Sequence, residues 1–108
     1  MLFAFRCVLL VFLLLLQSAC VSGYNLREGI NNFRAQNYRD AFIRLMPEAV
    51  KGQPDAQYAI GYMYYYGQGV VEDHEKAWQW ISSAAKVGQP DAVAAMEILA
   101  EKRPIKVN

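Results

Sequence analysis

Apolar residues follow two different patterns along this chain. From Cys7 to Leu16 every residue is apolar, and Arg6 is the single charged residue before this run. After about residue 24, apolar residues recur every three or four positions, as they do on the buried face of a helix. One such series has the spacing i, i+4, i+7, i+8 and i+11, and consists of Ala77, Ile81, Ala84, Ala85 and Gly88. The pattern predicts an all-α protein in which an apolar N-terminal helix precedes the periodic region.

Glycine, proline and aspartate divide the periodic region into five predicted helices. Gly-Gln-Pro-Asp occurs at 52–55 and at 88–91. Its glycine can take the left-handed conformation that ends a helix, its proline suits the first turn of the next, and its aspartate complements the helix dipole. Gly67 and Gly69 break the third helix, and Asp73 is a good N-cap for the fourth. The predicted helices span about 26–35, 38–51, 54–66, 73–87 and 90–102.

The chain contains an internal repeat. The pentapeptide that begins at Gly52 recurs without change at Gly88, 36 residues later, and the same shift aligns 40–42 with 76–78. A period of this size indicates stacked pairs of helices. Because the Gly-Gln-Pro-Asp joint is tight, the flanking helices should be antiparallel neighbours.

Residues 54–88 resemble the Sel1-like repeat, a relative of the tetratricopeptide repeat. The shared positions are Ala56, Ile60-Gly61, Tyr64, Gly67-Gln-Gly69-Val70, Asp73, Lys76-Ala77, Trp80, Ala84-Ala85 and Gly88. Residues 38–53 look like the second helix of a preceding unit and 90–102 like the first helix of a following one, although Glu97 stands where Gly61 stood.

The resemblance implies an α/α superhelical solenoid of about two and a half helix pairs. It also implies an adaptor or scaffold surface for other proteins, often in the bacterial envelope or secreted, and no reaction. The residues that it implies for the structure of the repeat are Gly61, Gly67, Gly69, Asp73, Ala77, Trp80, Ala85 and Gly88.

The apolar N-terminal run fits a secretory signal peptide. A transmembrane helix needs roughly 20 apolar residues, whereas a signal needs a positive start, a shorter apolar run and a small-residue cleavage site. Val21 and Gly23 suit cleavage before Tyr24. We therefore assign 1–23 to the signal and 24–108 to an exported repeat domain, periplasmic or secreted; an uncleaved anchor is the alternative.

A second processing route involves Cys20. Leu16-Gln-Ser-Ala-Cys20 resembles the lipobox of bacterial lipoproteins, although Gln17 stands where an aliphatic residue is usual. The alternative function is thus that of an outer-membrane lipoprotein that assists the assembly or regulation of an envelope complex. Because Cys7 is the only other cysteine, either route leaves the mature domain without a disulfide, so its fold must rely on packing.

Charge and candidate chemistry exclude several functions. Without Arg6 the chain has ten basic against ten acidic side chains with no basic stripe, which disfavours nucleic-acid binding. No nucleophile–base pair, phosphate loop or metal-ligand spacing is visible. His74 lies among acidic residues at a predicted helix start, where the positive end of the helix dipole favours negative side chains. We expect no enzyme activity, metal or cofactor; a cell-wall hydrolase is a less favoured alternative.

Tyrosines crowd the predicted helix 54–66. Tyr58, Tyr62 and Tyr65 (or Tyr66) lie at i, i+4 and i+7 (or i+8), and the first helix of each pair in such solenoids lines the concave face. We predict a partner-binding face at Tyr58, Tyr62 and Tyr65; the alternatives are that most tyrosines pack between units, or that the chain is a spacer without a groove. Because about three units are normally needed for stability, we expect a partner protein or a second copy to cover exposed apolar surface.

Overall fold

A computed structural model describes residues 1–102, except for the side chains of 17–22. Within this range the chain forms five α-helices and no strand, which confirms the all-α fold class. The helices are α1 (Leu2–Arg34), α2 (Tyr38–Val50), α3 (Pro54–Tyr66), α4 (His74–Lys86) and α5 (Pro90–Lys102). The predicted bounds of the last four helices agree with these to within one residue at each end.

The predicted break between an N-terminal helix and a second helix that starts at residue 26 is wrong, because α1 begins at Leu2 and continues without a break to Arg34. No proline occurs in this stretch, and a single glycine such as Gly23 costs a helix only about 1 kcal/mol. The predicted helix start was placed after the proposed cleavage site of a signal peptide, and a cleavage site need not interrupt a helix. No helix in the described part of the chain is both long and apolar enough to cross a membrane.

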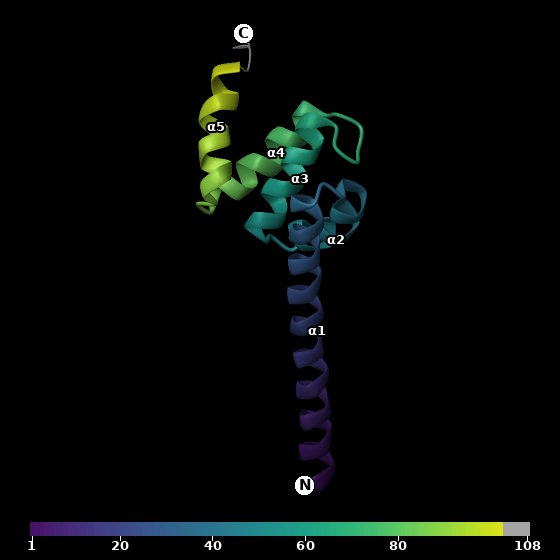
Figure 1. The fold of residues 1–108 in the computed structure, drawn as a ribbon. Helices are drawn as coiled ribbons and strands as arrows, with labels where there is room; N and C mark the ends of the chain where they lie inside the picture. The colour runs from purple at the N-terminus through teal and green to yellow at the C-terminus, as the bar shows by residue number, and fades with distance from the viewer. Residues whose placement is uncertain (103–108) are drawn as a thin grey trace.

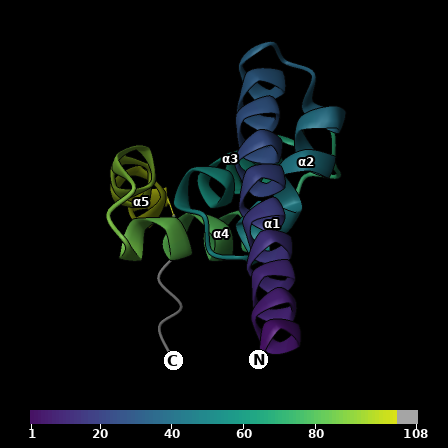
Figure 2. The same ribbon diagram turned by 90° about the horizontal axis from the view of Figure 1, so that it is seen from below.

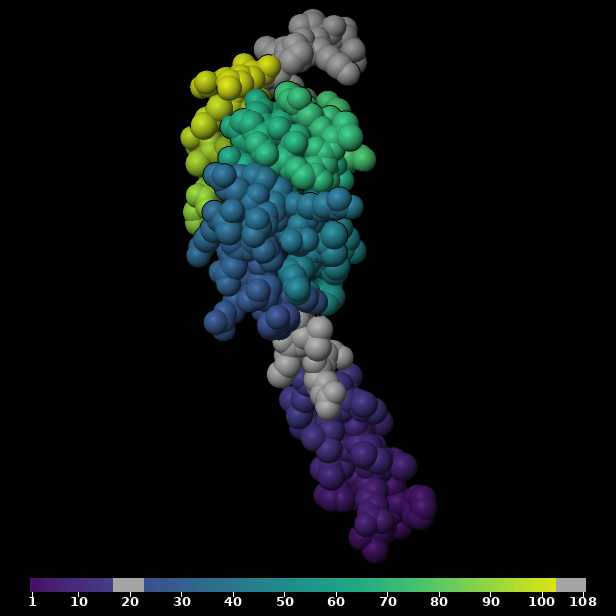
Figure 3. Space-filling view, turned by 45° about the vertical axis from the view of Figure 1, so that its right-hand side comes forward, coloured from purple at the N-terminus to yellow at the C-terminus, as the bar shows by residue number. Residues whose placement is uncertain are grey.

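The first half of α1 projects from the rest of the molecule (Figure 1). The radius of gyration is 18.2 Å, whereas a compact chain of this length has a value of about 13 Å. The apolar side chains of residues 8–16 are about half exposed or more, from Leu13 at 49% to Val8 at 68%. Figure 3 shows α2 to α5 as one continuous body that α1 leaves at its lower end.

Each helix packs against the next one along the chain, and α1 also packs against α3. Seen from below, α2 and α5 lie on opposite sides of α3 and α4 (Figure 2). This sequential side-by-side order is that of an α/α solenoid. The helices α1, α3 and α5 are the first members of successive pairs, and α5 has no second helix within the described residues.

The core is built mainly from alanine and a few larger residues. Its larger cluster joins α2 and α3 and consists of Ala41, Leu45, Ala49, Ala56, Ala59, Ile60 and Met63. A smaller one joins α4 and α5 and consists of Ile81, Ala84 and Ala92. Small residues let the helix axes approach: a Cβ on Gly61 of α3 would lie 2.5 Å from Ile81 Cγ1 and 3.2 Å from the Ala77 carbonyl oxygen of α4.

The repeated pentapeptide forms the same joint twice. Gly52 and Gly88 have φ of +100° and +83°, the left-handed conformation expected at a helix end. The next residue then caps the following helix with its side chain: Gln53 Oε1 accepts from the Asp55 amide at 2.8 Å, and Gln89 Oε1 accepts from the Ala92 amide at 2.6 Å. These glutamine caps were not predicted from the sequence.

Candidate partner-binding groove

A groove of about 300 Å³ lies between α3 and α5. It exists because α5 packs on α4 rather than on α3, so the facing sides of α3 and α5 stay apart. One wall is aromatic and comes from α3, with Tyr58, Tyr62, Tyr65 and Tyr66. The floor includes Ile81, and the opposite wall comes from α5, with Asp91, Ala94, Ala95, Ile98, Leu99 and Lys102.

The tyrosine rings of α3 contact one another in series. The ring centroids of Tyr62 and Tyr66 are 4.8 Å apart, and those of Tyr65 and Tyr66 are 4.9 Å apart in an edge-to-face arrangement. The Tyr62 ring also meets Phe33 of α1 edge to face at 5.2 Å. Such pairs contribute about 0.5–1.5 kcal/mol each beyond area burial. The aromatic wall is therefore held in place by its own packing, while Tyr66 remains 57% exposed.

His74 packs against the aromatic wall from the start of α4. Its ring stacks on Tyr65 with centroids 4.5 Å apart and an interplanar angle of 11°, and its Nε2 lies 2.8 Å from Glu72 Oε1. The N-cap of α4 is Asp73, as predicted, because its Oδ1 accepts from the Lys76 amide at 3.0 Å. His74 thus shields one face of Tyr65, a contact that the sequence did not indicate. Among the described residues no group of three or more His, Cys, Asp or Glu could hold a metal.

Burial and charge both raise the pKa of tyrosines in the groove. Burial is the larger cause of the raised pKa of Tyr58, followed by the negative charge of Asp91. Burial also raises the pKa of Tyr62, with smaller contributions from Tyr38 and Tyr66. Tyrosine hydroxyls are protonated at neutral pH in any case and can donate hydrogen bonds to a ligand; the raised pKa extends this to higher pH.

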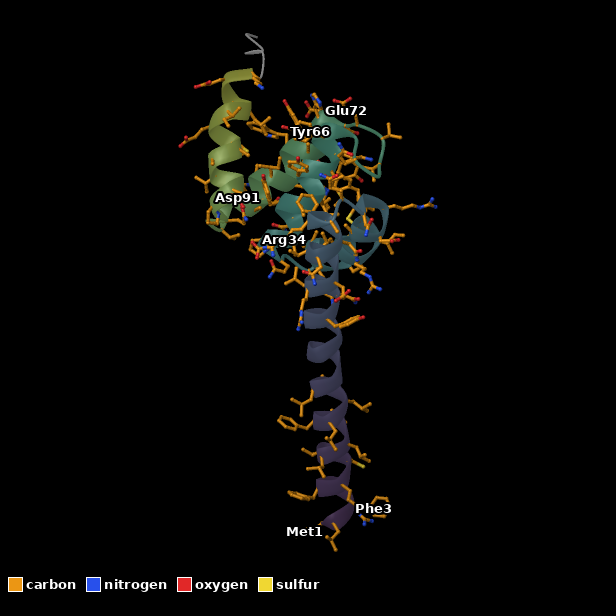
Figure 4. The ribbon with its side chains drawn as sticks, viewed as in Figure 1. Met1, Phe3, Arg34, Tyr66, Glu72 and Asp91 are labelled. Atoms are coloured by element: carbon orange, nitrogen blue, oxygen red, sulfur yellow. The ribbon has the colours of Figure 1, made fainter. Side chains whose placement is uncertain are left out.

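A second hollow, of about 220 Å³, adjoins the groove at the start of α3 and α5. Tyr58 and Asp91 line both the groove and this second hollow. Its other lining residues include Asp55, Gln89 and Arg34. The Gln89 amide Nε2 donates to Asp55 Oδ1 at 3.3 Å, so the side chains of the two pentapeptides meet beside the groove. Figure 4 shows Asp91 at the foot of α5 and Arg34 nearby on α1.

The structure brings together all three tyrosines predicted for the partner-binding face. Tyr58, Tyr62 and Tyr65 line the groove. Tyr66, the alternative to Tyr65 at the third position of the predicted stripe, lines it as well. The alternative of packing between units also holds in part. The ring of Tyr64 meets Phe42 of α2 edge to face at 5.7 Å, and that of Tyr62 meets Phe33 of α1 at 5.2 Å. The α5 wall was missed, although the spacing of Ala94, Ile98 and Leu99 placed an apolar stripe on that helix.

The residues predicted to shape the repeat occupy different environments. Gly61 lies at the α3–α4 contact, and Gly67 ends α3 with φ +66°. Gly69 approaches α2 so closely that a Cβ would lie 2.8 Å from the carbonyl carbon of Tyr38. Ala77 is buried, whereas Trp80 and Ala85 are half-buried against the two core clusters.

The prediction that Gly88 belongs to the buried stripe of α4 is wrong. Gly88 is exposed, and a Cβ there would meet nothing within 4 Å. The helix ends at Lys86, two residues earlier, so Gly88 is needed for its conformation rather than for packing. Cys20, the predicted lipid-attachment residue, lies outside the side chains that the structure describes.

Comparison with known proteins gives short but consistent matches. Chitin synthase regulatory factor 3 of Schizosaccharomyces pombe is 36% identical over 77 residues, 71% of this chain and 8% of that protein. The ERAD-associated E3 ubiquitin-protein ligase component HRD3A of Arabidopsis thaliana is 42% identical over 55 residues, 50% of this chain and 8% of that protein. Chitin synthase regulator SKT5 of Saccharomyces cerevisiae is 39% identical over 46 residues, 43% of this chain and 7% of that protein.

The chain therefore spans less than a tenth of the length of these relatives. No solved structure is significantly similar to it. The Sel1 repeat model matches residues 54–89, which include all of α3 and α4 and the capping Gln89. The paired helices, their shared positions and this match together identify residues 54–89 of the chain as a Sel1 repeat.

Proposed function

We propose that this protein is a non-catalytic adaptor that binds another protein in the groove between α3 and α5. Sel1 repeats are protein–protein interaction modules, and residues 54–89 supply the aromatic wall and the floor of the groove. Aromatic side chains with little freedom to move are the residues that most often anchor a protein partner. The observation that carries the proposal is the series of contacting tyrosine rings that faces an apolar side of α5.

Exposed apolar side chains on the second wall support the same proposal. Ile98 of α5 lines the groove and is 56% exposed, although it faces the aromatic wall. A ligand between the walls would remove apolar surface from water on both sides, at about 25 cal/mol for each Å² buried. The free protein thus keeps apolar surface exposed in a concave site, as binding grooves commonly do.

A crosslinking pulldown from the native host tests this proposal. Tyr66→Ala and Ile98→Ala each truncate one wall at a largely exposed residue, so the fold should tolerate both. The matched controls are Ile43→Ala, at 64% exposure, and Val50→Ala, at 71% exposure, which lie on α2 outside the groove. We expect the controls to keep the partner of the wild type and both groove variants to lose it. If every variant keeps every partner, the groove is not the binding site and a spacer role is favoured.

We further propose that residues 1–23 direct export, so that the repeat domain acts in the cell envelope or outside the cell. The apolar run supports this, as do both core clusters, whose members among the described side chains all lie beyond residue 25. Mass spectrometry of the mature protein tests it. A chain that begins at Tyr24 supports free release; an intact chain that begins at Met1 contradicts export with cleavage.

The lipobox-like sequence before Cys20 supports the lipoprotein alternative. In that case the mature chain begins with an acylated Cys20 and fractionates with the outer membrane. Cys20→Ser then abolishes the added lipid mass. The same spectrum therefore separates free release, lipid anchoring and retention of the whole N-terminal helix.

A further inference from the structure

The charged residues that line the groove lie at opposite ends of it. Asp91 is in the first turn of α5 and Lys102 is its last residue. Eleven helical steps of 1.5 Å place them about 16 Å apart along the helix. The walls between these ends are aromatic on α3 and apolar on α5. The groove is therefore negative at one end, positive at the other and apolar between them.

The negative end is reinforced by a second carboxylate. Asp55 lines the adjoining hollow together with Asp91 and Tyr58. Arg34 lines the same hollow, but neither carboxylate forms an ion pair with it within 4 Å. One cation against two anions leaves a net charge of −1 at this end. A ligand cation can therefore approach Asp91 without displacing an existing ion pair.

The tyrosine wall adds a second attraction for a cation. A Lys or Arg head group within about 6 Å of a ring centroid is stabilised by the negative face of the ring. Tyr58 lines both hollows beside Asp91, and its ring lies 6.4 Å from that of Tyr62. The chain makes this kind of contact elsewhere, since Lys76 Nζ lies 5.4 Å from the Tyr64 ring centroid.

We propose that the groove binds an extended peptide segment of the partner with a Lys or Arg at one end and a carboxylate about five residues further along. The spacing follows from the 16 Å between Asp91 and Lys102, because an extended chain rises about 3.3 Å per residue. The basic residue lies on the rings of Tyr58 and Tyr62 beside Asp91. The acidic residue, or a terminal carboxylate, pairs with Lys102, and apolar residues lie between. This inference rests on the proposed protein-binding function.

Selection from a displayed library of random 12-residue peptides tests the inference, with the full chain held in mild detergent as bait. We expect the wild type to enrich peptides with a basic and an acidic residue about five positions apart. Asp91→Asn should lose the enrichment of the basic residue and Lys102→Gln that of the acidic one. The double variant Asp91→Lys, Lys102→Asp should select the reversed order of charges. Glu97→Lys, on an exposed part of α5 outside the groove, is the control and should select as the wild type does.

Affinity measurements on the best selected peptide complete the test. Replacing its basic residue by Gln should weaken binding to the wild type at least tenfold and leave binding to Asp91→Asn nearly unchanged. Each other outcome overturns the inference in a recognisable way. If the selected peptides are uncharged and apolar, and their binding requires Tyr66 and Ile98, the groove binds peptides without recognising charged residues.

Three further results would also decide against the inference. If no peptide is enriched while Tyr66→Ala still loses the pulldown partner, the proposed function stands and the linear-peptide inference falls. If light scattering shows a dimer that Tyr66→Ala dissociates, the occupant is a second copy of the chain. If selected peptides bind Tyr66→Ala and Ile98→Ala as well as the wild type, the groove is the wrong site and both proposals fall.

Discussion

The Gln89 side-chain amide donates a hydrogen bond to the carboxylate of Asp55, 34 residues earlier in the chain. Each of these residues belongs to one copy of the repeated pentapeptide. Gln89 Oε1 at the same time caps α5 by accepting from the Ala92 amide. One buried glutamine, 8% exposed, therefore starts α5 and connects its position to the start of α3. It fixes the end of the groove where Asp91 and Tyr58 lie.

Gln89→Ala should destabilise the protein by about 1–2 kcal/mol, because it removes a helix N-cap and a side-chain hydrogen bond from a buried site. Gln53→Ala removes the equivalent cap of α3 at 2.8 Å but no link between repeat units, so its cost should be smaller. Urea unfolding followed by circular dichroism measures both. Gln79→Ala, at an exposed position on α4, is the control. Equal effects at positions 53 and 89 would contradict the linking role of Gln89.

Gly61→Ala should destabilise the α3–α4 pair by about 1–3 kcal/mol through overpacking. The added Cβ would lie 2.5 Å from Ile81 Cγ1 and 3.2 Å from two backbone atoms of α4, which cannot rotate away. The same unfolding experiment measures the loss, with Ser82→Ala on the surface of α4 expected to change stability by less than about 0.5 kcal/mol. A Gly61→Ala variant as stable as the wild type would show that α3 and α4 are not in close contact.

Asparagine should distinguish two glycines that both have positive φ. Asparagine tolerates the left-handed conformation better than other residues with a Cβ. Gly88 has open space around it, whereas a Cβ on Gly69 would lie 2.8 Å from the carbonyl carbon of Tyr38 and 2.9 Å from the Arg39 nitrogen. We expect Gly88→Asn to shift the thermal midpoint little and Gly69→Asn to lower it clearly. The reverse order would place the α3–α4 loop away from α2.

Tyr58 should titrate at higher pH than a free tyrosine, because burial and the charge of Asp91 raise its pKa. Its folded pKa lies above the unfolded value of about 10. The stabilisation from its neutral form is therefore present below that value and is lost as the pH rises through the folded pKa. NMR of ring-labelled tyrosine measures the titration, and Asp91→Asn should lower the pKa of Tyr58. Glu97→Gln, outside the groove, should leave the pKa of Tyr58 unchanged. If it lowers this pKa as much as Asp91→Asn does, the charge of Asp91 is not the specific cause of the shift.

Local signals made most of the fold predictable from the sequence. Gly52, Gly67 and Asp73 mark helix ends through conformation and capping that depend on a few neighbouring residues, and the structure has helix ends at all three. The glutamine caps were missed because Ser, Thr, Asp and Asn are the favoured N-caps. A helix at the N-terminus was predicted, but its continuation to Arg34 in α1 was missed, because a cleavage site carries no information about where a helix ends.

The groove could be predicted only in part for a similar reason. The tyrosine stripe is a property of one helix, so its spacing was visible in the sequence. The groove also requires that α5 pack on α4 and stay apart from α3, and no local pattern specifies that separation. Likewise the stacking of His74 on Tyr65 depends on the path of the loop between α3 and α4. Contacts between helices could therefore not be predicted from the sequence.

Site-specific photocrosslinking in the native host tests most directly whether a partner occupies the groove. A photoreactive phenylalanine analogue replaces Tyr66 on the aromatic wall, Ile98 on the α5 wall or, as a control, Ile43 on α2. We expect one and the same partner protein to crosslink from the first two positions and not from the third. Crosslinks to a partner from Ile43 alone, with none from either wall, would contradict binding in the groove.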